Sequence, residues 1–366
     1  MHTPSATADA STAPAPAPAA SQRSRSDYQL IGGAGERAQA AGLVNASWYK
    51  CAVPRAQMKE LMQRSDAQAI RDTVLWYALI AAAGALVVAT WSTPWVLLAF
   101  FLYATLYCGP ADSRWHESSH GTAFKTRWMN DLLYQVASFQ VLRRPTVWRW
   151  SHARHHTDTL VTGRDPEVAV PLPTDIVGML LNLVALKNGP RELWRVLKNA
   201  CGVLGEEEKT FVPAMEWPRV VREARIWVLV YGALIGASFA LHSCLPIVLF
   251  GLLPGMCGTW LYTFFGLTQH AGLPENVTDH RLNCRTVYMN PVFRFLYWNM
   301  NYHVEHHMFP MVPFHALPQL HEAIKADCPP PYQGTAQAYR EILPAILRQA
   351  REPDYFVQRE LPAKAV

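Results

Sequence analysis

Two long apolar blocks without any charged side chain constrain this 366-residue chain more than any other feature. They span residues 74–110 and 226–266, and each is long enough for two membrane-spanning helices of about 20 residues. The first block is interrupted at residues 91–94 (WSTP) and the second at residues 242–246 (HSCLP), where turn-forming residues gather. We therefore predict an all-α integral membrane protein with four transmembrane helices arranged as two hairpins.

Positively charged residues indicate how these hairpins are oriented. No Lys or Arg occurs between Arg71 and Arg114 or between Arg225 and Arg281. Because cytoplasmic loops are enriched in Lys and Arg, both termini and the central segment are predicted to lie on the cytoplasmic side. The net charge of +5 is explained by this bias and gives no indication of nucleic acid binding. The alternative is a soluble protein with two buried helical hairpins, but the remaining polar chain would hardly cover four uncharged helices.

The two blocks divide the chain into six segments. These are a disordered Ala- and Pro-rich tail (1–26), cytoplasmic lead-in helices (27–73), the first hairpin (74–110), a cytoplasmic segment (111–225), the second hairpin (226–268) and a final cytoplasmic segment (269–366). Within the lead-in, helical spacing predicts a helix over residues 54–71, with Ser65 and Gln68 forming a capping box before the first hairpin. Seven cysteines without a C-x-x-C pair are predicted to be scattered thiols.

Eight of the fourteen histidines lie in three short boxes: HESSH at 116–120, HARHH at 152–156 and HVEHH at 303–307. On a helix, spacings of three and four residues place side chains on one face, so each box is expected to converge on a common point. Convergent imidazoles bind iron, zinc, copper or nickel, and eight of them overfill any single site. We therefore predict a cytoplasmic helical cap that carries two metal ions, with iron and oxygen chemistry as the first choice.

Two other metal-dependent functions fit parts of this pattern. HESSH also matches the H-E-x-x-H motif of zinc proteases, with Glu117 as the general base. A protease needs only one further ligand, however, and has no use for two additional histidine boxes. A metal transporter or sensor would place ionisable ligands within the membrane-spanning segments, and the two blocks contain almost none.

The three boxes, spaced around two hydrophobic hairpins, resemble the H-x-x-x-H, H-x-x-H-H and H-x-x-H-H boxes of the membrane fatty-acid desaturase superfamily, which also includes hydroxylases. The resemblance covers most of the chain from about residue 48 to residue 352. Longer stretches, among them RWHESSHGTAFKTRWMND, WRWSHARHHTDT and NMNYHVEHHMFPMVPFHALP, are similar to a bacterial branch of the superfamily. That branch includes dihydrorhizobitoxine desaturase and the rhizopine-catabolism oxygenase.

The resemblance implies two non-haem iron ions that use O2 as a cosubstrate. Nine histidines are implied as their ligands, eight from the boxes and one from the sequence TQHAG: His116, His120, His152, His155, His156, His270, His303, His306 and His307. Animal acyl desaturases have an Asn four residues before the histidine that matches His270, whereas this chain has Gly266, which departs from the pattern for a water-mediated tenth ligand. The implied reaction is introduction of a C=C bond. Hydroxylation on the same diiron scaffold is the alternative, because the outcome depends on how the substrate carbon is positioned.

The sequence contains no module that would supply electrons. It lacks a Gly-rich dinucleotide fingerprint, a cysteine cluster for an iron–sulfur centre and a haem-binding module. A separate donor is therefore implied, a ferredoxin with its reductase, and four arginines are expected to contact either this donor or lipid headgroups: Arg143, Arg144, Arg149 and Arg154. The implied substrate is a fatty acyl chain or a small amphiphilic metabolite of the dihydrorhizobitoxine type. The implied location is the inner membrane of a bacterium.

Position in the sequence predicts the roles of acidic residues and histidines near the boxes. A carboxylate can orient a metal-binding imidazole by accepting its second ring N–H. We expect this role for Glu117 and Asp158, which belong to the box sequences, and expect four other acidic residues to lie at the surface: Asp112, Asp165, Glu167 and Glu305. Five histidines outside the boxes are predicted not to bind metal: His2, His242, His280, His315 and His321.

Overall fold

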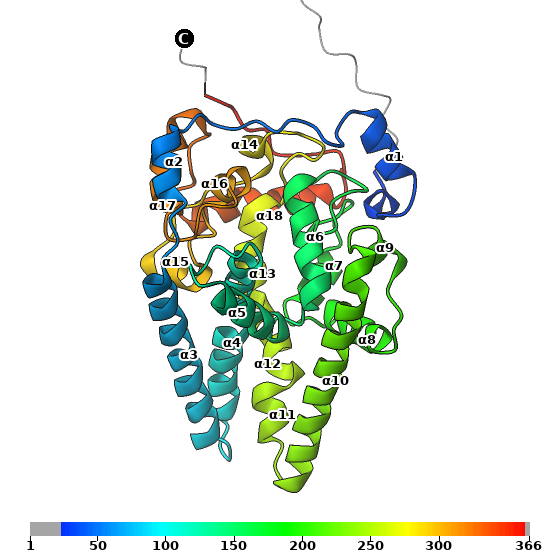
Figure 1. The fold of residues 1–366 in the computed structure, drawn as a ribbon, viewed down its shortest axis with the longest axis vertical. Coiled ribbons are helices and arrows are strands. Elements are labelled where there is room, and N and C mark those ends of the chain that lie inside the picture. The colour runs from blue at the N-terminus through cyan, green and yellow to red at the C-terminus, as the bar shows by residue number, and fades with distance from the viewer. Residues whose placement is uncertain (1–22, 363–366) are drawn as a thin grey trace, which may run out of the picture.

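The computed structural model describes residues 23–362, and within them the chain is helical, with only isolated β-bridges. Figure 1 shows long helices that project from one end of a cap built from shorter helices. The all-α prediction is thus confirmed for the described residues. The predicted tail lies outside them except for residues 23–26, where Ser24 caps a short 3-10 helix, η1 (Arg25–Tyr28).

The long helices form two pairs. α3 (Asp66–Ala89) turns into α4 (Val96–Ser119), and α10 (Trp217–Ala240) turns into α11 (Leu245–Phe250), α12 (Leu252–Cys257) and α13 (Thr259–His270). Both turns coincide with the interruptions predicted from the sequence. Helices α12 and α13 pack against α4, and this contact joins the two pairs.

Within residues 23–362, three stretches of helix are long and apolar enough to cross a membrane: Arg55–Ala89, Val96–Ser119 and Leu245–His270. Helix α10 is not among them, although it has the same length as α4. Its first turns carry four charged side chains: Arg219, Arg222, Glu223 and Arg225. The prediction of four transmembrane helices is therefore supported for three stretches.

Large apolar side chains on the long helices point away from the protein. Leu97 on α4 is 77% exposed, and Leu229 and Phe239 on α10 are 71% and 77% exposed. Exposed apolar surface of this extent is unfavourable in water and is compatible with a lipid environment. The alternative of a soluble protein with buried hairpins is therefore wrong.

Glycines divide the returning helix of the second pair into three pieces, whereas the sequence predicts a single helix there. Gly251 has an extended backbone between α11 and α12, and Gly258 separates α12 from α13. A Cβ atom on Gly258 would lie 2.0 Å from the carbonyl oxygen of Ala104 in α4. Non-bonded heavy atoms cannot approach so closely. Only glycine at this position therefore lets α4 and the second helix pair come into contact.

The lead-in differs from the predicted single helix. It consists of α2 (Arg55–Leu61) and the start of α3 at Asp66. Ser65 precedes α3 but its side chain makes no capping hydrogen bond, so the predicted capping box is absent. Instead the Asp66 carboxylate accepts hydrogen bonds from the backbone N–H and the hydroxyl of Thr126, at 2.9 and 2.7 Å, which ties α3 to the loop before α5.

The cap surrounds the ends of the long helices (Figure 1). Besides α2, its helices are α1 (Gly33–Ala40), α5 (Arg127–Gln140), α6 (Pro145–Thr157), α7 (Ile176–Asn182), α8 (Asn188–Ala200), α9 (Glu206–Lys209), α14 (His280–Asn283), α15 (Pro291–Tyr297), α16 (His303–Met308), α17 (Leu317–Ile324) and α18 (Thr335–Gln349), with short 3-10 helices η2 (Ala214–Glu216) and η3 (Lys325–Asp327).

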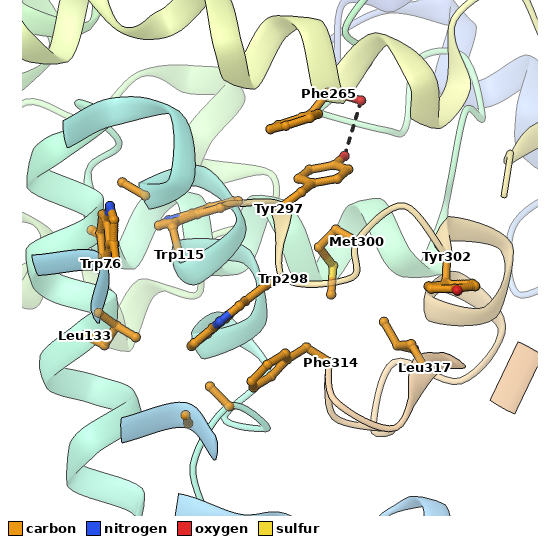
Figure 2. Close-up of a cluster of buried hydrophobic side chains, with 14 of the residues drawn as sticks. Trp76, Trp115, Leu133, Phe265, Tyr297, Trp298, Met300, Tyr302, Phe314 and Leu317 are labelled. Atoms are coloured by element: carbon orange, nitrogen blue, oxygen red, sulfur yellow. Dashed lines mark hydrogen bonds between the residues drawn. The ribbon is translucent and has the colours of Figure 1, made fainter. Parts of the chain in front are cut away.

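An aromatic core connects the long helices to the cap (Figure 2). Trp76 from α3 and Trp115 from α4 lie in the same cluster as Tyr297 and Trp298, which end α15. The Tyr297 hydroxyl donates a hydrogen bond to the Phe265 carbonyl of α13 at 3.3 Å. Burial of such large rings gives this junction much of its stability.

Arg114 is fully buried in this core, two residues before the first histidine box. Its guanidinium lies over the rings of Trp76 and Trp298, 5.1 and 4.8 Å from their centroids. It donates hydrogen bonds to the carbonyls of Leu296 and Phe295, at 2.5 and 2.9 Å, near the C-terminal end of α15. A cation is favourable at a helix C-terminus, so Arg114 joins the element carrying the first box to the element that precedes the third.

Candidate metal centre

The three histidine boxes meet inside the cap. The first box forms the end of α4, the second lies on α6, the third forms most of α16, and His270 is the last residue of α13. All nine histidines implied as ligands are buried or half-buried. The structure brings all nine together, and they separate into two groups.

The first group contains five histidines: His116, His120, His152, His156 and His306. One ring nitrogen from each lies within 4.8 Å of those of the others. Nε2 of His116 is 2.7 Å from Nε2 of His306, although the two residues are 190 positions apart. Nε2 of His152 lies 3.1 Å from Nε2 of His120 and 3.2 Å from Nε2 of His156.

The second group contains four histidines. Ring nitrogens of His155, His270 and His307 lie within 4.8 Å of one another. His303 completes the group, because its Nε2 lies 3.0 Å from Nε2 of His270 and 3.0 Å from Nε2 of His307.

The division into groups corrects the expectation that each box converges on one point. In the second box, the residues four apart, His152 and His156, enter the first group, while His155 enters the second. In the third box the assignment is reversed: His303 and His307 enter the second group and His306 the first. Each three-histidine box therefore contributes to both groups, which holds the groups side by side.

The geometry of the facing nitrogens fits metal ligation. Metal–imidazole bonds of about 2.1 Å meeting at right angles place neighbouring nitrogens about 3 Å apart. Five pairs of neighbouring Nε2 atoms lie 2.7 to 3.2 Å apart, close to this spacing. The donor set, imidazole nitrogen alone, suits iron, zinc, copper or nickel.

Hydrogen bonds to Nδ1 fix which ring nitrogen faces the interior. His152 Nδ1 lies 3.0 Å from Glu167 Oε2, and His155 Nδ1 lies 2.8 Å from Asp165 Oδ2. His270 Nδ1 donates to the carbonyl oxygen of Asn283 at 2.8 Å. Because these acceptors hold the proton on Nδ1, each Nε2 presents a lone pair to its group.

The carboxylates that accept the Nδ1 protons of the box histidines are not the two expected from the sequence. Asp165 and Glu167, predicted to lie at the surface, are the ones that contact the boxes. Asp158 instead pairs with Arg164 at 3.0 Å, and Glu117 accepts a hydrogen bond from the backbone N–H of Phe314 at 3.0 Å. Position within the box sequences did not predict contact, because Glu117 and Asp158 are engaged with these other partners.

Burial keeps most of these imidazoles neutral. It lowers the pKa of His152, His156 and His303 well below the usual value, and neighbouring imidazoles lower it further. The same holds for the pKa of His306 and His307. The neutral ring is the form that binds metal.

Acidic neighbours modify this pattern. Burial lowers the pKa of His155, but the charge of Asp165 and its hydrogen bond outweigh burial and raise it. Burial raises the pKa of Glu167 to about 7.

Asp165 and Glu167 are held by a tight turn at Gly163, which has φ of +73°. A Cβ there would lie 2.6 Å from Ala34 Cβ and 2.6 Å from the Gly35 backbone nitrogen in α1. We expect Gly163→Ala to lower the free energy of unfolding by about 2–3 kcal/mol, the sum of positive-φ strain and displacement of α1. Thermal unfolding in detergent would measure this loss.

Gly42 provides the matched control for this substitution. It has φ of +72°, but a Cβ there meets nothing within 4 Å. Gly42→Ala should therefore cost only the backbone strain, about 1 kcal/mol. Equal losses for the two variants would show that contact with α1 does not restrain the turn.

Comparison with known protein families matches residues 91–339 to the fatty acid desaturase family. This match covers more than half of the chain and includes all three histidine boxes. The chain belongs to the fatty acid desaturase family. No curated protein matches the sequence. As a member of this desaturase family, the protein is an oxidoreductase of the membrane with a histidine metal site, and the family implies an electron donor and a lipid substrate.

The zinc protease alternative does not fit this desaturase family member. In a protease, Glu117 would have to face the metal as general base. Here Glu117 is fully buried, its carboxylate accepts from the Phe314 N–H, and it belongs to neither histidine group. The HESSH sequence thus resembles a protease motif without its geometry.

The four arginines expected to contact a donor or lipid headgroups are engaged within the desaturase. Arg143 pairs with Asp112 at 2.5 Å, and Arg144 pairs with Glu208 at 2.7 Å; both arginine side chains are largely buried. Arg154 donates to the Thr210 carbonyl at 3.0 Å, and Arg149 pairs with Asp131 at 3.1 Å. Arg143 and Arg144 thus have little exposed surface to offer a donor or lipid headgroup, and the role expected of the four arginines stays a prediction.

Two histidines outside the boxes are less isolated than predicted. His280 is buried, stacks on Trp48 with ring centroids 4.3 Å apart, and lies with Cys284 and His307 in a third close group. His321 is buried against Glu305. No sequence pattern signals either contact, because both depend on tertiary packing.

A small cavity of about 20 Å³ lies beside Gly266 and His270 and has room for about one water molecule. The sequence does not predict this cavity.

Proposed function

We propose that this desaturase family member binds two irons, one in each histidine group, and uses O2 to introduce a C=C bond into its substrate. The observation that carries the proposal is the pair of adjacent buried groups, one of five and one of four histidines, whose Nε2 atoms converge. The ligands of the first iron would be His116, His120, His152, His156 and His306. Those of the second would be His155, His270, His303 and His307.

The irons would supply the oxidising power for removal of hydrogen from an unactivated C–H bond. The balanced reaction is R–CH2–CH2–R′ + O2 + 2 e⁻ + 2 H⁺ → R–CH=CH–R′ + 2 H2O. The protein's residues would hold the imidazoles in place: Glu167 and Asp165 accept the Nδ1 protons of His152 and His155. Burial of the cluster excludes bulk water, which would otherwise quench a strong oxidant.

The substrate is proposed to be a fatty acyl chain or a small amphiphilic metabolite of the dihydrorhizobitoxine type. This follows from the similarity of the box sequences to the bacterial branch described above. Hydroxylation remains the second candidate: R–H + O2 + 2 e⁻ + 2 H⁺ → R–OH + H2O. The same histidines would serve either outcome.

The proposed topology has four transmembrane helices in two hairpins, with both termini and the metal centre on the cytoplasmic side of a bacterial inner membrane. The apolar outer surface of α10 supports its inclusion as the fourth helix, despite the charges in its first turns. The proposed segment boundaries are those predicted from the sequence. The proposed electron donor is a ferredoxin with its reductase.

Product analysis under 18O2 tests the proposal. Purified protein in lipid nanodiscs is supplied with ferredoxin, its reductase, NADPH and a series of acyl lipids and amphiphilic amino acids, and products are identified by mass spectrometry. We expect an alkene two mass units below the substrate and without 18O. An 18O-labelled alcohol would establish the hydroxylase instead, whereas no O2-dependent product from any substrate would contradict both.

A further inference from the structure

A groove on the cap combines an apolar floor with a cationic edge. Its volume is about 610 Å³, and it lies between residues 50–53, α2 and Phe309, which follows the third histidine box. Met58, Met62 and Phe309 contribute apolar surface, and Lys50, Arg55 and Lys59 contribute charge.

The three cations are free to meet an external partner. Lys50, Arg55 and Lys59 are exposed, and none forms an ion pair with any residue from 23 to 362. This contrasts with Arg143 and Arg144, whose charges are paired within the protein. The groove therefore presents unneutralised positive charge around a concave apolar surface, which complements an acidic protein surface with an apolar contact at its centre.

The groove also lies next to the metal centre. Phe309 follows His307 by two residues, and the backbone N–H of Cys51 donates to Met308 Sδ at 3.1 Å. A partner in the groove would thus contact the same short segment that carries the third box. Figure 1 places α2 beside α17 in the cap, at the end remote from the tips of α3 and α4. A soluble protein reaches this position directly, whereas a lipid dissolved in the bilayer approaches from the opposite end.

We infer that the groove bounded by Lys50, Arg55 and Lys59 is the docking surface for a small acidic redox protein that delivers electrons to the metal centre. This inference rests on the proposed function, because only an oxidoreductase with an external donor requires such a surface. The cations steer the acidic partner, and the apolar floor provides the contact once it has docked.

Binding of an acidic plant-type [2Fe–2S] ferredoxin tests the inference. Full-length protein in nanodiscs of neutral lipid is immobilised, and association and dissociation rates are measured at low and high salt. The triple variant Lys50→Glu, Arg55→Glu and Lys59→Glu should bind ferredoxin at least about tenfold more weakly at low salt, mainly through slower association. High salt should weaken binding to the wild type and remove most of the difference.

A second triple variant controls for total charge. Arg191→Glu, Arg222→Glu and Arg340→Glu replace exposed arginines on α8, α10 and α18 that form no ion pair with described residues. It should bind ferredoxin like the wild type. Equal weakening in both variants, or none in the groove variant, would overturn the inference. Weaker binding of laurate or of anionic vesicles by the groove variant, with ferredoxin binding unchanged, would identify an amphiphile or lipid site and would also overturn it.

A chemical reductant separates this inference from the proposed function. With dithionite in place of ferredoxin, the groove variant should form as much product per iron as the wild type, whereas ferredoxin-driven product should fall about tenfold. Absence of product from the wild type with either reductant would contradict the proposed function. The binding measurement would still decide whether the groove docks the acidic protein.

Discussion

Replacing His303 with alanine is expected to reduce the iron content from about two to about one per chain and to lower product formation by more than about a thousandfold. His303 Nε2 lies 3.0 Å from Nε2 of both His270 and His307, so its removal takes one of only four ligands from the second group. Elemental analysis of protein purified in detergent, together with the product assay, would measure both effects.

His242→Asn is the control for this substitution. His242 lies in the turn after α10, far in sequence from every box, with φ of +50°, a conformation that Asn tolerates. His242→Asn should therefore keep about two irons and full activity. One zinc per chain with negligible iron in the wild type, or two irons retained by His303→Ala, would contradict the diiron proposal.

Replacing Asp165 with asparagine is expected to weaken iron binding at the second group about 10- to 100-fold. The Asp165 carboxylate accepts from His155 Nδ1, from the Leu160 N–H and from the Glu167 N–H, each at 2.8 Å. Asparagine keeps the shape but loses the charge that strengthens His155 as a ligand, and it has one acceptor oxygen in place of two. The rate of iron transfer to a chelator would measure the effect.

Glu305 provides the matched control for Asp165. It is fully buried and also pairs with a histidine, but that histidine, His321, lies outside both groups. Glu305→Gln should reduce thermal stability while leaving iron transfer to the chelator unchanged. If both variants lose iron equally, the effect of Asp165 is one of general stability rather than of ligand orientation.

The main helices could be predicted from the sequence, because long apolar segments without charged side chains are stable in few structures. It located both turns, at residues 91–94 and 242–246, since Pro and Ser interrupt the apolar runs there. It did not predict the division of α11, α12 and α13. That division depends on the approach of Gly258 to the Ala104 carbonyl, and a contact between distant segments leaves no local pattern.

The histidine cluster could be predicted as a set but not in its arrangement. Spacings of three and four residues place imidazoles on one side of a helix, and all nine do lie together. Which of them share a group depends on the relative rotation of α6 and α16, so His155 and His306 could not be assigned from spacing. The ion-pair partners of charged residues could not be predicted either. Arg144 is buried and pairs with Glu208, which lies 64 residues further along the chain.

The burial of Arg114 has a consequence for how the protein is made. Its carbonyl partners on Phe295 and Leu296 lie 181 and 182 residues further along the chain. At about 5–20 residues per second, the ribosome needs roughly 10–40 s to supply them after Arg114 has been synthesised. During that interval α4 carries a cation without its final acceptors, and the first histidine box lacks every ligand from the third. Assembly of the centre is therefore a late event in biogenesis, and a nascent chain truncated before α15 would expose Arg114 and leave both histidine groups incomplete.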